Sequence, residues 1–226
     1  MNSPHRSEST PRVLLLHGIW NARSWVAPLA WRLRAQGFKV DVFGYPSVFG
    51  GPDVALPALV QRLRESGPVN VVGHSLGGVM ALEALRRAPD AQVPRLVCVG
   101  SPLCGSLAAR NLALRPWTAP LLGRSAALLQ SGCEPWKGPT EVGVVAGVRA
   151  RGIGRLLARF DGDSDGTVSV AETRLEGLAD HCTVSVSHTG LVFSAEAARR
   201  VGEFLREGRF QGAGATEMAS PDGVMK

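Results

Sequence analysis

The sequence predicts an α/β fold, in which a minimal, mainly parallel sheet of about six strands has helices on both faces and a short lid-like insertion. Short apolar runs alternate with segments of helical periodicity along most of the chain, which is typical of a parallel sheet with crossover helices. The 226 residues, 45% of them hydrophobic, are enough for one sizeable core and indicate one domain.

The first half of the chain predicts two units of strand, loop and helix, followed by a third strand. Residues 13–16 form an apolar run that stops at a glycine, as a buried parallel strand does. Apolar side chains recur at helical spacing over residues 24–37, with a proline in the tolerated first turn and a glycine at the end. Residues 38–43 follow as a strand, Asp53 can cap the next helix, and residues 69–72 form the third strand.

The second half continues this alternation around one interruption. Residues 95–99, 141–146 and 182–186 are expected strands, and Ser194 can cap a final helix. Residues 103–140 are rich in Leu, Ala and Pro and break the rhythm, so we treat them as a candidate lid or cap insertion. In such a sheet, ligands are expected at the carboxyl ends of the strands.

The domain is expected to span residues 12–210, with residues 1–11 and 211–226 as flexible tails. The first ten residues contain no apolar segment of the kind that a secretory signal needs, so we expect a cytoplasmic protein. No uninterrupted apolar run approaches the roughly 20 residues of a membrane span.

Composition argues against several other classes of function. The formal charge is +6, but the basic residues are scattered through helical segments without interleaved aromatic residues, so we expect no nucleic-acid partner. The four cysteines include no C-x-x-C pair, and neither they nor the histidines fall at metal-ligand spacing. No zinc site and no cofactor are expected, and the sequence indicates no oligomeric state.

The strongest motif is Gly-His-Ser-Leu-Gly at residues 73–77, which satisfies the pattern G-x-S-x-G. Such a short pattern can arise by chance in a glycine-rich protein. Here it stands between an apolar strand and a helical segment, where a nucleophile at a sharp turn needs small neighbours. The position therefore favours Ser75 as a nucleophile.

A serine nucleophile needs a base, and a histidine beyond another strand end can supply it. His188 lies just past the last expected strand, whereas His181 falls at the wrong end of that strand. The alternative for His188 is an ordinary surface-loop histidine. A carboxylate that holds the imidazole commonly lies between the serine and the histidine in the chain; we choose Asp165, with Asp163 as the alternative.

Two backbone N–H groups are expected to stabilise the oxyanion of the tetrahedral intermediate. The N–H of Leu76 follows the nucleophile, and that of Ile19 lies in the loop after the first strand. Trp20, His74 and Leu103 stand beside these motifs and are expected to contact the substrate.

A competing interpretation concerns residues 161–172. Asp161, Asp163, Asp165, Gly166 and Glu172 match the calcium-loop pattern D-x-[DN]-x-[DN]-G-x₅-E at every specified position. Calcium loops of this kind join two helices, whereas the β-branched run at residues 167–170 predicts a brief strand. A bound ion would also draw Asp165 away from the histidine.

Taken together, the motifs resemble the lipase and esterase branch of the α/β-hydrolase superfamily. The resemblance is carried by His17-Gly18-Ile19, Gly73-His74-Ser75-Leu76-Gly77-Gly78, Asp165-Gly166-Thr167-Val168 and Ser187-His188-Thr189. It implies the α/β-hydrolase fold and the same nucleophile, acid, base and oxyanion donors. Gly100-Ser101-Pro102 with Gly105-Ser106 is similar to the post-strand loop of bacterial triacylglycerol lipases and of deacylases acting on lipid-linked inositol.

The expected function is therefore a serine hydrolase that cleaves a carboxylic ester, in a small molecule or an acyl lipid, through an acyl-enzyme. A thioesterase or acyltransferase with the same triad stays open. The alternative from another class is a non-catalytic calcium-binding protein that uses residues 161–172.

Overall fold

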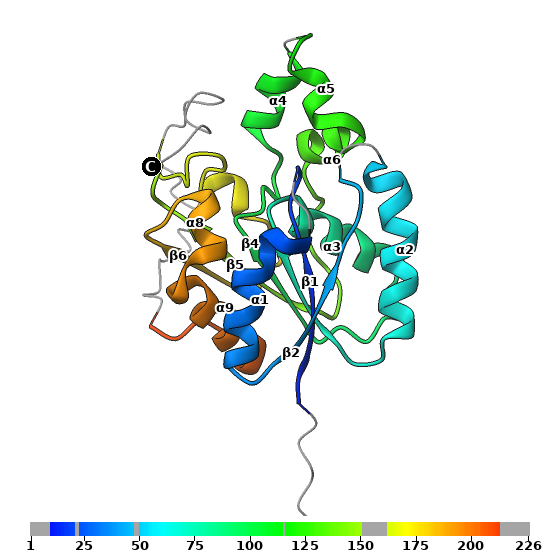
Figure 1. The fold of residues 1–226 in the computed structure, drawn as a ribbon, viewed down its shortest axis with the longest axis vertical. Helices are drawn as coiled ribbons and strands as arrows, with labels where there is room; N and C mark the ends of the chain where they lie inside the picture. Colours follow the sequence, from blue (N-terminus) through cyan, green and yellow to red (C-terminus); the bar gives the residue numbers. More distant parts are fainter. Residues whose placement is uncertain (1–9, 21–22, 48–49, 115, 151–161, 213–226) are drawn as a thin grey trace, which may run out of the picture.

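One parallel sheet organises the computed structural model, which describes residues 10–20, 23–47, 50–114, 116–150 and 162–212 (Figure 1). Its six strands lie in the order β2-β1-β3-β4-β5-β6, and every neighbouring pair is parallel. The strands are β1 (Arg12–Leu16), β2 (Lys39–Phe43), β3 (Asn70–His74), β4 (Arg95–Val99), β5 (Glu141–Gly147) and β6 (Asp180–Val184). The predicted α/β fold with a small parallel sheet is confirmed.

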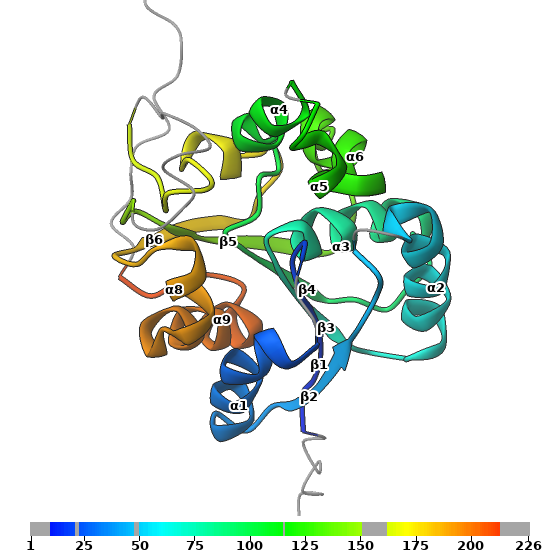
Figure 2. The same ribbon diagram turned by 45° about the horizontal axis from the view of Figure 1, so that its top comes forward.

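Helices cover both faces of this sheet, as Figure 2 shows. One face carries α1 (Ala27–Ala35), α8 (His188–Phe193) and α9 (Ala195–Glu207), and the other carries α2 (Gly51–Glu65) and α3 (Leu76–Arg87). The insertion adds α4 (Leu107–Ala113), α5 (Ala119–Leu122) and α6 (Ala126–Ser131) on the side of α3. Short 3₁₀ helices η1 (Arg23–Val26), η2 (Gly123–Ser125) and η3 (Ala171–Thr173) complete the elements.

The core divides into two apolar layers because successive strand residues point to opposite faces. In β1, Leu14 and Leu16 pack with α2 and α3, whereas Val13 and Leu15 pack with α1 and α9. All four side chains are almost fully buried. This burial on both faces explains why the strand appears in the sequence as a continuous apolar run rather than an alternating one.

The helix ends agree in part with the predictions. Ser194 caps α9 by accepting a hydrogen bond from the Ala197 N–H at 3.1 Å. Asp53 does not cap α2, because that helix begins at Gly51 and Asp53 lies inside its first turn. The expected helix over residues 24–37 begins with the 3₁₀ turn of η1 before α1.

Two segments near the carboxyl end differ from expectation. The last strand, β6, begins and ends two residues earlier than predicted; its pairing with β5 starts at Asp180, and after Val184 the Val186 N–H donates to the Val184 carbonyl in a tight turn. The brief strand expected over residues 167–170 is only a single antiparallel bridge between Ser164 and Ser169. Residues 1–9 and 213–226, which make up most of the expected tails, lie outside the described residues.

The first and last segments of the insertion lie side by side and are joined by backbone hydrogen bonds. The Ser106 N–H donates to the Leu129 carbonyl at 2.8 Å, and the Cys133 N–H donates to the Leu103 carbonyl at 2.6 Å. Its helices α4 and α5 lie at the top of Figure 1, beyond the carboxyl ends of the strands. Within the described part of the chain, no helix has the length and apolar character needed to cross a bilayer.

Candidate active site

Ser75 occupies a strained turn between β3 and α3. Its backbone has φ 55° and ψ −122°, a combination that L side chains rarely adopt. The turn is held by a 2.9 Å hydrogen bond from the Ser75 N–H to the Val99 carbonyl at the end of β4. The serine side chain therefore stands at the carboxyl edge of the sheet, at the amino end of α3, where the helix dipole is positive.

The glycines around Ser75 are required by close backbone packing. A Cβ on Gly73 would lie 2.3 Å from the Gly78 nitrogen, and one on Gly77 would lie 2.7 Å from the His17 carbonyl oxygen. Both distances are too short for any real Cβ contact, and the opposing atoms are backbone. The G-x-S-x-G spacing therefore serves the geometry of the turn.

His188 and Asp165 form a hydrogen-bonded pair. His188 Nδ1 lies 2.7 Å from Asp165 Oδ2, and the His188 backbone N–H donates to the Asp165 carbonyl at 3.0 Å. The other carboxylate oxygen of Asp165 accepts from the N–H groups of Thr167 and Val168, at 2.9 and 2.7 Å. Because a carboxylate only accepts, His188 Nδ1 carries the proton and Nε2 is left as the acceptor.

Asp163, the alternative carboxylate, does not reach the imidazole in this structure. Asp163 is exposed, and its backbone carbonyl accepts a hydrogen bond from the Val170 N–H at 2.9 Å. Asp165 is 1% exposed and lies beneath His188.

The pair packs against the Ser75 turn. A Cβ on Gly100, the residue after the Val99 that holds Ser75, would lie 3.3 Å from both His188 Nδ1 and Asp165 Oδ2. The ring of His74, the neighbour of Ser75, has its centroid 4.9 Å from that of His188. The structure thus brings the three predicted triad residues to one edge of the sheet.

Ser75 is not hydrogen-bonded to His188 in this structure. The Ser75 hydroxyl makes no hydrogen bond to any residue that the structure describes, whereas the histidine–aspartate bond is formed. Catalytic hydrogen bonds in ligand-free sites are often long and tighten only around the substrate.

The two expected oxyanion donors follow the neighbouring strands β1 and β3 at equivalent positions in the sequence. Leu16 and Gly73 are register partners in β1 and β3, and Ile19 and Leu76 each stand three residues further on. Leu76 begins α3, so its N–H belongs to the helical turn that lacks intrahelical acceptors. Both residues therefore follow the edge of the sheet at which Ser75 lies.

A buried network orients the loop that contains Ile19. His17 Nε2 accepts from the Tyr45 N–H at 3.3 Å, so Nδ1 carries the proton and donates to the Gly18 carbonyl at 2.9 Å. The Tyr45 hydroxyl donates to the His17 carbonyl at 2.7 Å, and the two rings stack with centroids 4.4 Å apart. In a trans peptide the N–H points opposite to the C=O, so anchoring the Gly18 oxygen turns the Ile19 N–H away from His17.

Burial keeps His17 and His74 neutral near neutral pH. It lowers the pKa of His17 below its ordinary value, and it lowers the pKa of His74 to about 3, with the neighbouring His188 acting in the same direction. His74 Nε2 lies 3.3 Å from the His188 carbonyl, which can only accept, so Nε2 carries the proton. His74 therefore supports the His188 backbone.

The predicted substrate-contact residues lie in different environments. Trp20 is 52% exposed, has φ 61°, and its indole N–H donates to the Leu121 carbonyl in α5 at 2.5 Å. His74 and Leu103 are buried, and Leu103 packs in the core layer of α3. Of the three, only Trp20 presents its side chain at the surface.

Residues of the calcium pattern have other partners in this structure. Both Asp165 oxygens accept hydrogen bonds from the protein, and Glu172 accepts from the N–H groups of Ser169 and Leu107, at 2.7 and 2.5 Å. Asp161 lies outside the described residues. Among those that are described, no group of three His, Cys, Asp or Glu side chains is placed to hold a metal ion.

The sequence analysis missed the roles of two residues that hold the loops around Ser75 in place. Tyr45 follows the end of β2. The one feature of the sequence that could have indicated its role is an aromatic residue just after the carboxyl end of a predicted strand. The sequence indicated Glu172 only as a candidate calcium ligand. In the structure it connects the loop of Asp165 to the first turn of α4 by accepting a hydrogen bond from the Leu107 N–H. Neither pairing could be found without knowing which loops meet.

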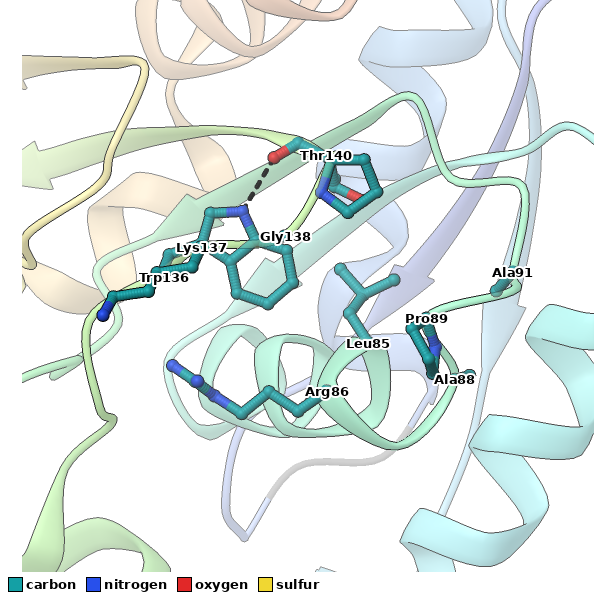
Figure 3. Close-up of a pocket in the computed structure, with 10 residues that line it drawn as sticks. Leu85, Arg86, Ala88, Pro89, Ala91, Trp136, Lys137, Gly138 and Thr140 are labelled. Carbon is teal, nitrogen blue, oxygen red and sulfur yellow. Dashed lines mark hydrogen bonds between the residues drawn. The ribbon is translucent and has the colours of Figure 1, made fainter.

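A separate cavity of about 310 Å³ lies at the other end of α3 (Figure 3). Leu85, Arg86 and Trp136 line it, and the Trp136 indole N–H donates to the Thr140 carbonyl at 2.8 Å. At 1.5 Å per helical residue, Arg86 lies roughly 17 Å along α3 from Ser75. The cavity lining contains no acid or histidine and has no part in the arrangement around Ser75.

A serine in a strand-to-helix turn, beside a histidine–aspartate pair at one edge of a parallel α/β sheet, defines the class of α/β hydrolases. Residues 13–211 match the model of the Alpha/beta hydrolase family, and the chain belongs to this family. None of the curated proteins compared matches the sequence.

Solved structures share the fold at low sequence identity. A metagenomic carboxyl esterase has a TM-score of 0.61 at 19% identity, covering 89% of this chain and 77% of its own. A pyrethroid hydrolase from Sphingobium faniae JZ-2 has a TM-score of 0.58 at 13% identity, covering 88% and 98%. The thioesterase domain from the curacin biosynthetic pathway has a TM-score of 0.52 at 17% identity, covering 88% and 92%. At these identities the likeness concerns the fold alone.

Proposed function

We propose that this chain is a serine hydrolase that cleaves a carboxylic ester through an acyl-enzyme, with Ser75, His188 and Asp165 as its triad. The observation that carries the proposal is the Asp165–His188 pair packed against Gly100, directly beside the strained Ser75 turn. An aspartate–histidine pair with a purely structural role does not require a strained serine and close-packed glycines beside it. Such strain is typical of functional sites.

The proposed reaction proceeds in two halves. Ser75 Oγ attacks the ester carbonyl carbon while His188 Nε2 takes the hydroxyl proton, and the N–H groups of Ile19 and Leu76 stabilise the oxyanion. The intermediate collapses, the C–O bond to the alcohol breaks, and His188 returns the proton to the departing oxygen. Water then attacks the acyl-enzyme with the same base, which releases the carboxylic acid and restores the Ser75 hydroxyl.

Asp165 acts by holding the histidine in its proton-accepting form. Its carboxylate is fixed by two backbone N–H groups and keeps the proton of His188 on Nδ1. Nε2 is then free to accept the proton of the serine. The aspartate stabilises the imidazolium that forms during attack without taking its proton.

The same triad could act on a thioester or transfer the acyl group to another acceptor. Both a carboxyl esterase and a thioesterase domain share this fold. An acyl lipid is a further candidate substrate within the ester class. The choice depends on the substrate and not on the triad, so turnover of acyl esters and of acyl thioesters of matched chain length by the wild type distinguishes the two.

A fluorophosphonate probe tests the nucleophile. We expect labelling of the wild type, loss of labelling in Ser75→Ala, and a fall in ester turnover of about 10⁴-fold or more in that variant. Ser131→Ala, which alters an exposed serine in α6, is the matched control and should retain both. Retained labelling in Ser75→Ala, or no turnover of any ester or thioester by the labelled wild type, would contradict the proposal.

A further inference from the structure

Exposed apolar side chains gather at one end of the molecule. Nine large hydrophobic side chains are exposed in the described part of the chain, and seven of them lie in the insertion or in the segments directly after β1 and β6. The exceptions are Trp31 in α1 and Val54 in α2. All seven therefore belong to segments that follow the carboxyl ends of β1, β4 or β6, the edge of the sheet that holds Ser75.

The most exposed of them form the tip of the insertion. Leu114 is 80% exposed and Trp117 is 76% exposed, and both lie in the turn between α4 and α5, at the top of Figure 1. The indole of Trp20 donates to the Leu121 carbonyl in α5, which joins the loop after β1 to the insertion. We call Trp20, Leu114, Trp117 and Leu121 the apolar tip.

A second exposed pair stands after β1 and β6. Trp25 in η1 and Phe193 at the end of α8 are in edge-to-face contact, with ring centroids 5.9 Å apart. Phe193 lies five residues after His188. The edge of the sheet that carries the triad is thus flanked by exposed aromatic groups from two separate segments.

The charge of these segments has one sign. Residues 11–40 and 103–133 contain no Asp or Glu, although they carry several arginines. Arg110 contacts the carbonyl of Gln130, and Arg124 lies 3.4 Å from Asp53 of α2 in an exposed ion pair, which contributes little. Two carboxylates from other segments contact the insertion, Asp53 at Arg124 and Glu172 at the Leu107 N–H, but the charged residues of the two segments themselves are all basic. Exposed tryptophans on basic segments match the interface of a bilayer that carries negative headgroups.

We propose that the apolar tip docks this protein onto the surface of an anionic phospholipid membrane, with Trp117 and Leu114 inserted among the headgroups. A surface-bound mode is consistent with the finding that no helix among the described residues can cross a bilayer. A second copy of the chain is a poorer occupant, because a symmetric contact would place arginine-rich segments without acidic residues against one another. Docking in this orientation turns the edge that carries Ser75 toward the lipid.

Vesicle flotation tests the docking independently of catalysis. The full-length Ser75→Ala protein is mixed with vesicles of phosphatidylcholine alone or of equal parts phosphatidylcholine and phosphatidylglycerol. We expect flotation with the mixed vesicles, little with phosphatidylcholine alone, and a loss on raising the salt from about 0.1 M to about 1 M, where the Debye length falls to about 3 Å. Because the variant lacks the proposed nucleophile, the outcome does not depend on whether Ser75 is catalytic.

Paired variants locate the contact. Leu114→Ser with Trp117→Ser should weaken flotation about 10-fold or more, since each removes apolar surface from the lipid. Trp31→Ser, which alters a 65% exposed tryptophan on α1, should float as the parent does. In the active protein, turnover of a short soluble ester should be unchanged by either set.

The proposal fails if the mixed vesicles do not float the parent, or if the tip variant floats as well as the parent does. Flotation that is equal with neutral vesicles, or equally lost in Trp31→Ser, would also overturn it. So would a dimer in size-exclusion chromatography that the tip substitutions dissociate and that binds no vesicles.

Discussion

At the scale of single residues, Asp165 is distinguished from Asp163 by what surrounds its carboxylate. Asp165 is buried beneath His188 and accepts three hydrogen bonds, whereas Asp163 is exposed. Asp165→Asn should lower kcat for ester hydrolysis by about 10³-fold or more, because an amide can stabilise the wrong imidazole tautomer. Asp163→Asn should leave kcat within a few-fold of the wild type, and steady-state kinetics on one soluble ester compares them.

The two substitutions form a matched pair, two residues apart in one loop. Equal losses in both variants would indicate that the loop, and not the Asp165 carboxylate, is what activity requires. A fluorophosphonate rate that is unchanged in Asp165→Asn would remove the carboxylate from the proposed mechanism.

Residue identity could be predicted from sequence where chemistry restricts the choice. Ser75 had a motif, and His188 had few rivals, so the sequence singled out residues that the structure brings to one edge. Asp165 was preferred to Asp163, but the sequence left both open, because only the fold shows which carboxylate lies beneath the imidazole. Tyr45 had no motif at all, and its role depends on the loops after β1 and β2 lying in contact.

At the scale of elements, the turn between β3 and α3 depends on the loop after β1. A Cβ on Gly77 would press on the His17 and Leu16 carbonyl oxygens, at 2.7 and 2.8 Å. Gly77→Ala should therefore displace the loop that presents the Ile19 N–H, and kcat should fall about 10²-fold, the cost of one oxyanion donor. Kinetics on a soluble ester and thermal unfolding of the same preparation measure activity and stability together.

Gly67→Ala is the control for this substitution. Gly67 has φ +61°, and a Cβ there would meet nothing within 4 Å, so the change costs about 1 kcal/mol of stability through its backbone alone. We expect a lower melting temperature with kcat intact. A Gly77→Ala enzyme with wild-type kcat would mean that the loop after β1 does not present a catalytic donor.

Element types were more predictable than element ends. The buried strands are continuous apolar runs, and α9 has both a capping serine and Gly208 in a left-handed conformation at its end. The predicted end of β6 is two residues too late, and the sequence did not predict the short helix α8, which begins at His188. Short helices and strand ends are set by tertiary contacts, to which local periodicity is insensitive.

At the scale of the whole molecule, three histidines lie in buried or partly buried places: His17 after β1, His74 at the end of β3 and His181 in β6. Burial lowers the pKa of His74 to about 3 and that of His181 to about 4, and it also lowers the pKa of His17. Each of these groups is neutral in the folded protein near neutral pH. In the unfolded chain the same side chains titrate near the ordinary value of about 6.5.

This difference predicts that stability falls on mild acidification. Below about pH 6.5 the unfolded chain binds protons that the folded protein cannot accept until the pH nears 3 to 4, so the free energy of unfolding decreases as the pH falls through that window. For the buried His74 the slope is about 1 kcal/mol per pH unit. Urea unfolding at about pH 7 and about pH 5 measures it above the range where carboxylates titrate.

His74→Asn isolates one contribution, because it removes the titrating ring from the position between Ser75 and the His188 backbone. The variant should be less stable than the wild type near neutral pH, since its amide must replace the bond to the His188 carbonyl. Its free energy of unfolding should nevertheless decline less steeply between the two pH values, since one proton-binding site has left the unfolded chain. The slope is a difference between conditions, so it stays measurable in a destabilised protein. A slope equal to that of the wild type would show that His74 accepts its proton in the folded state despite its burial against His188.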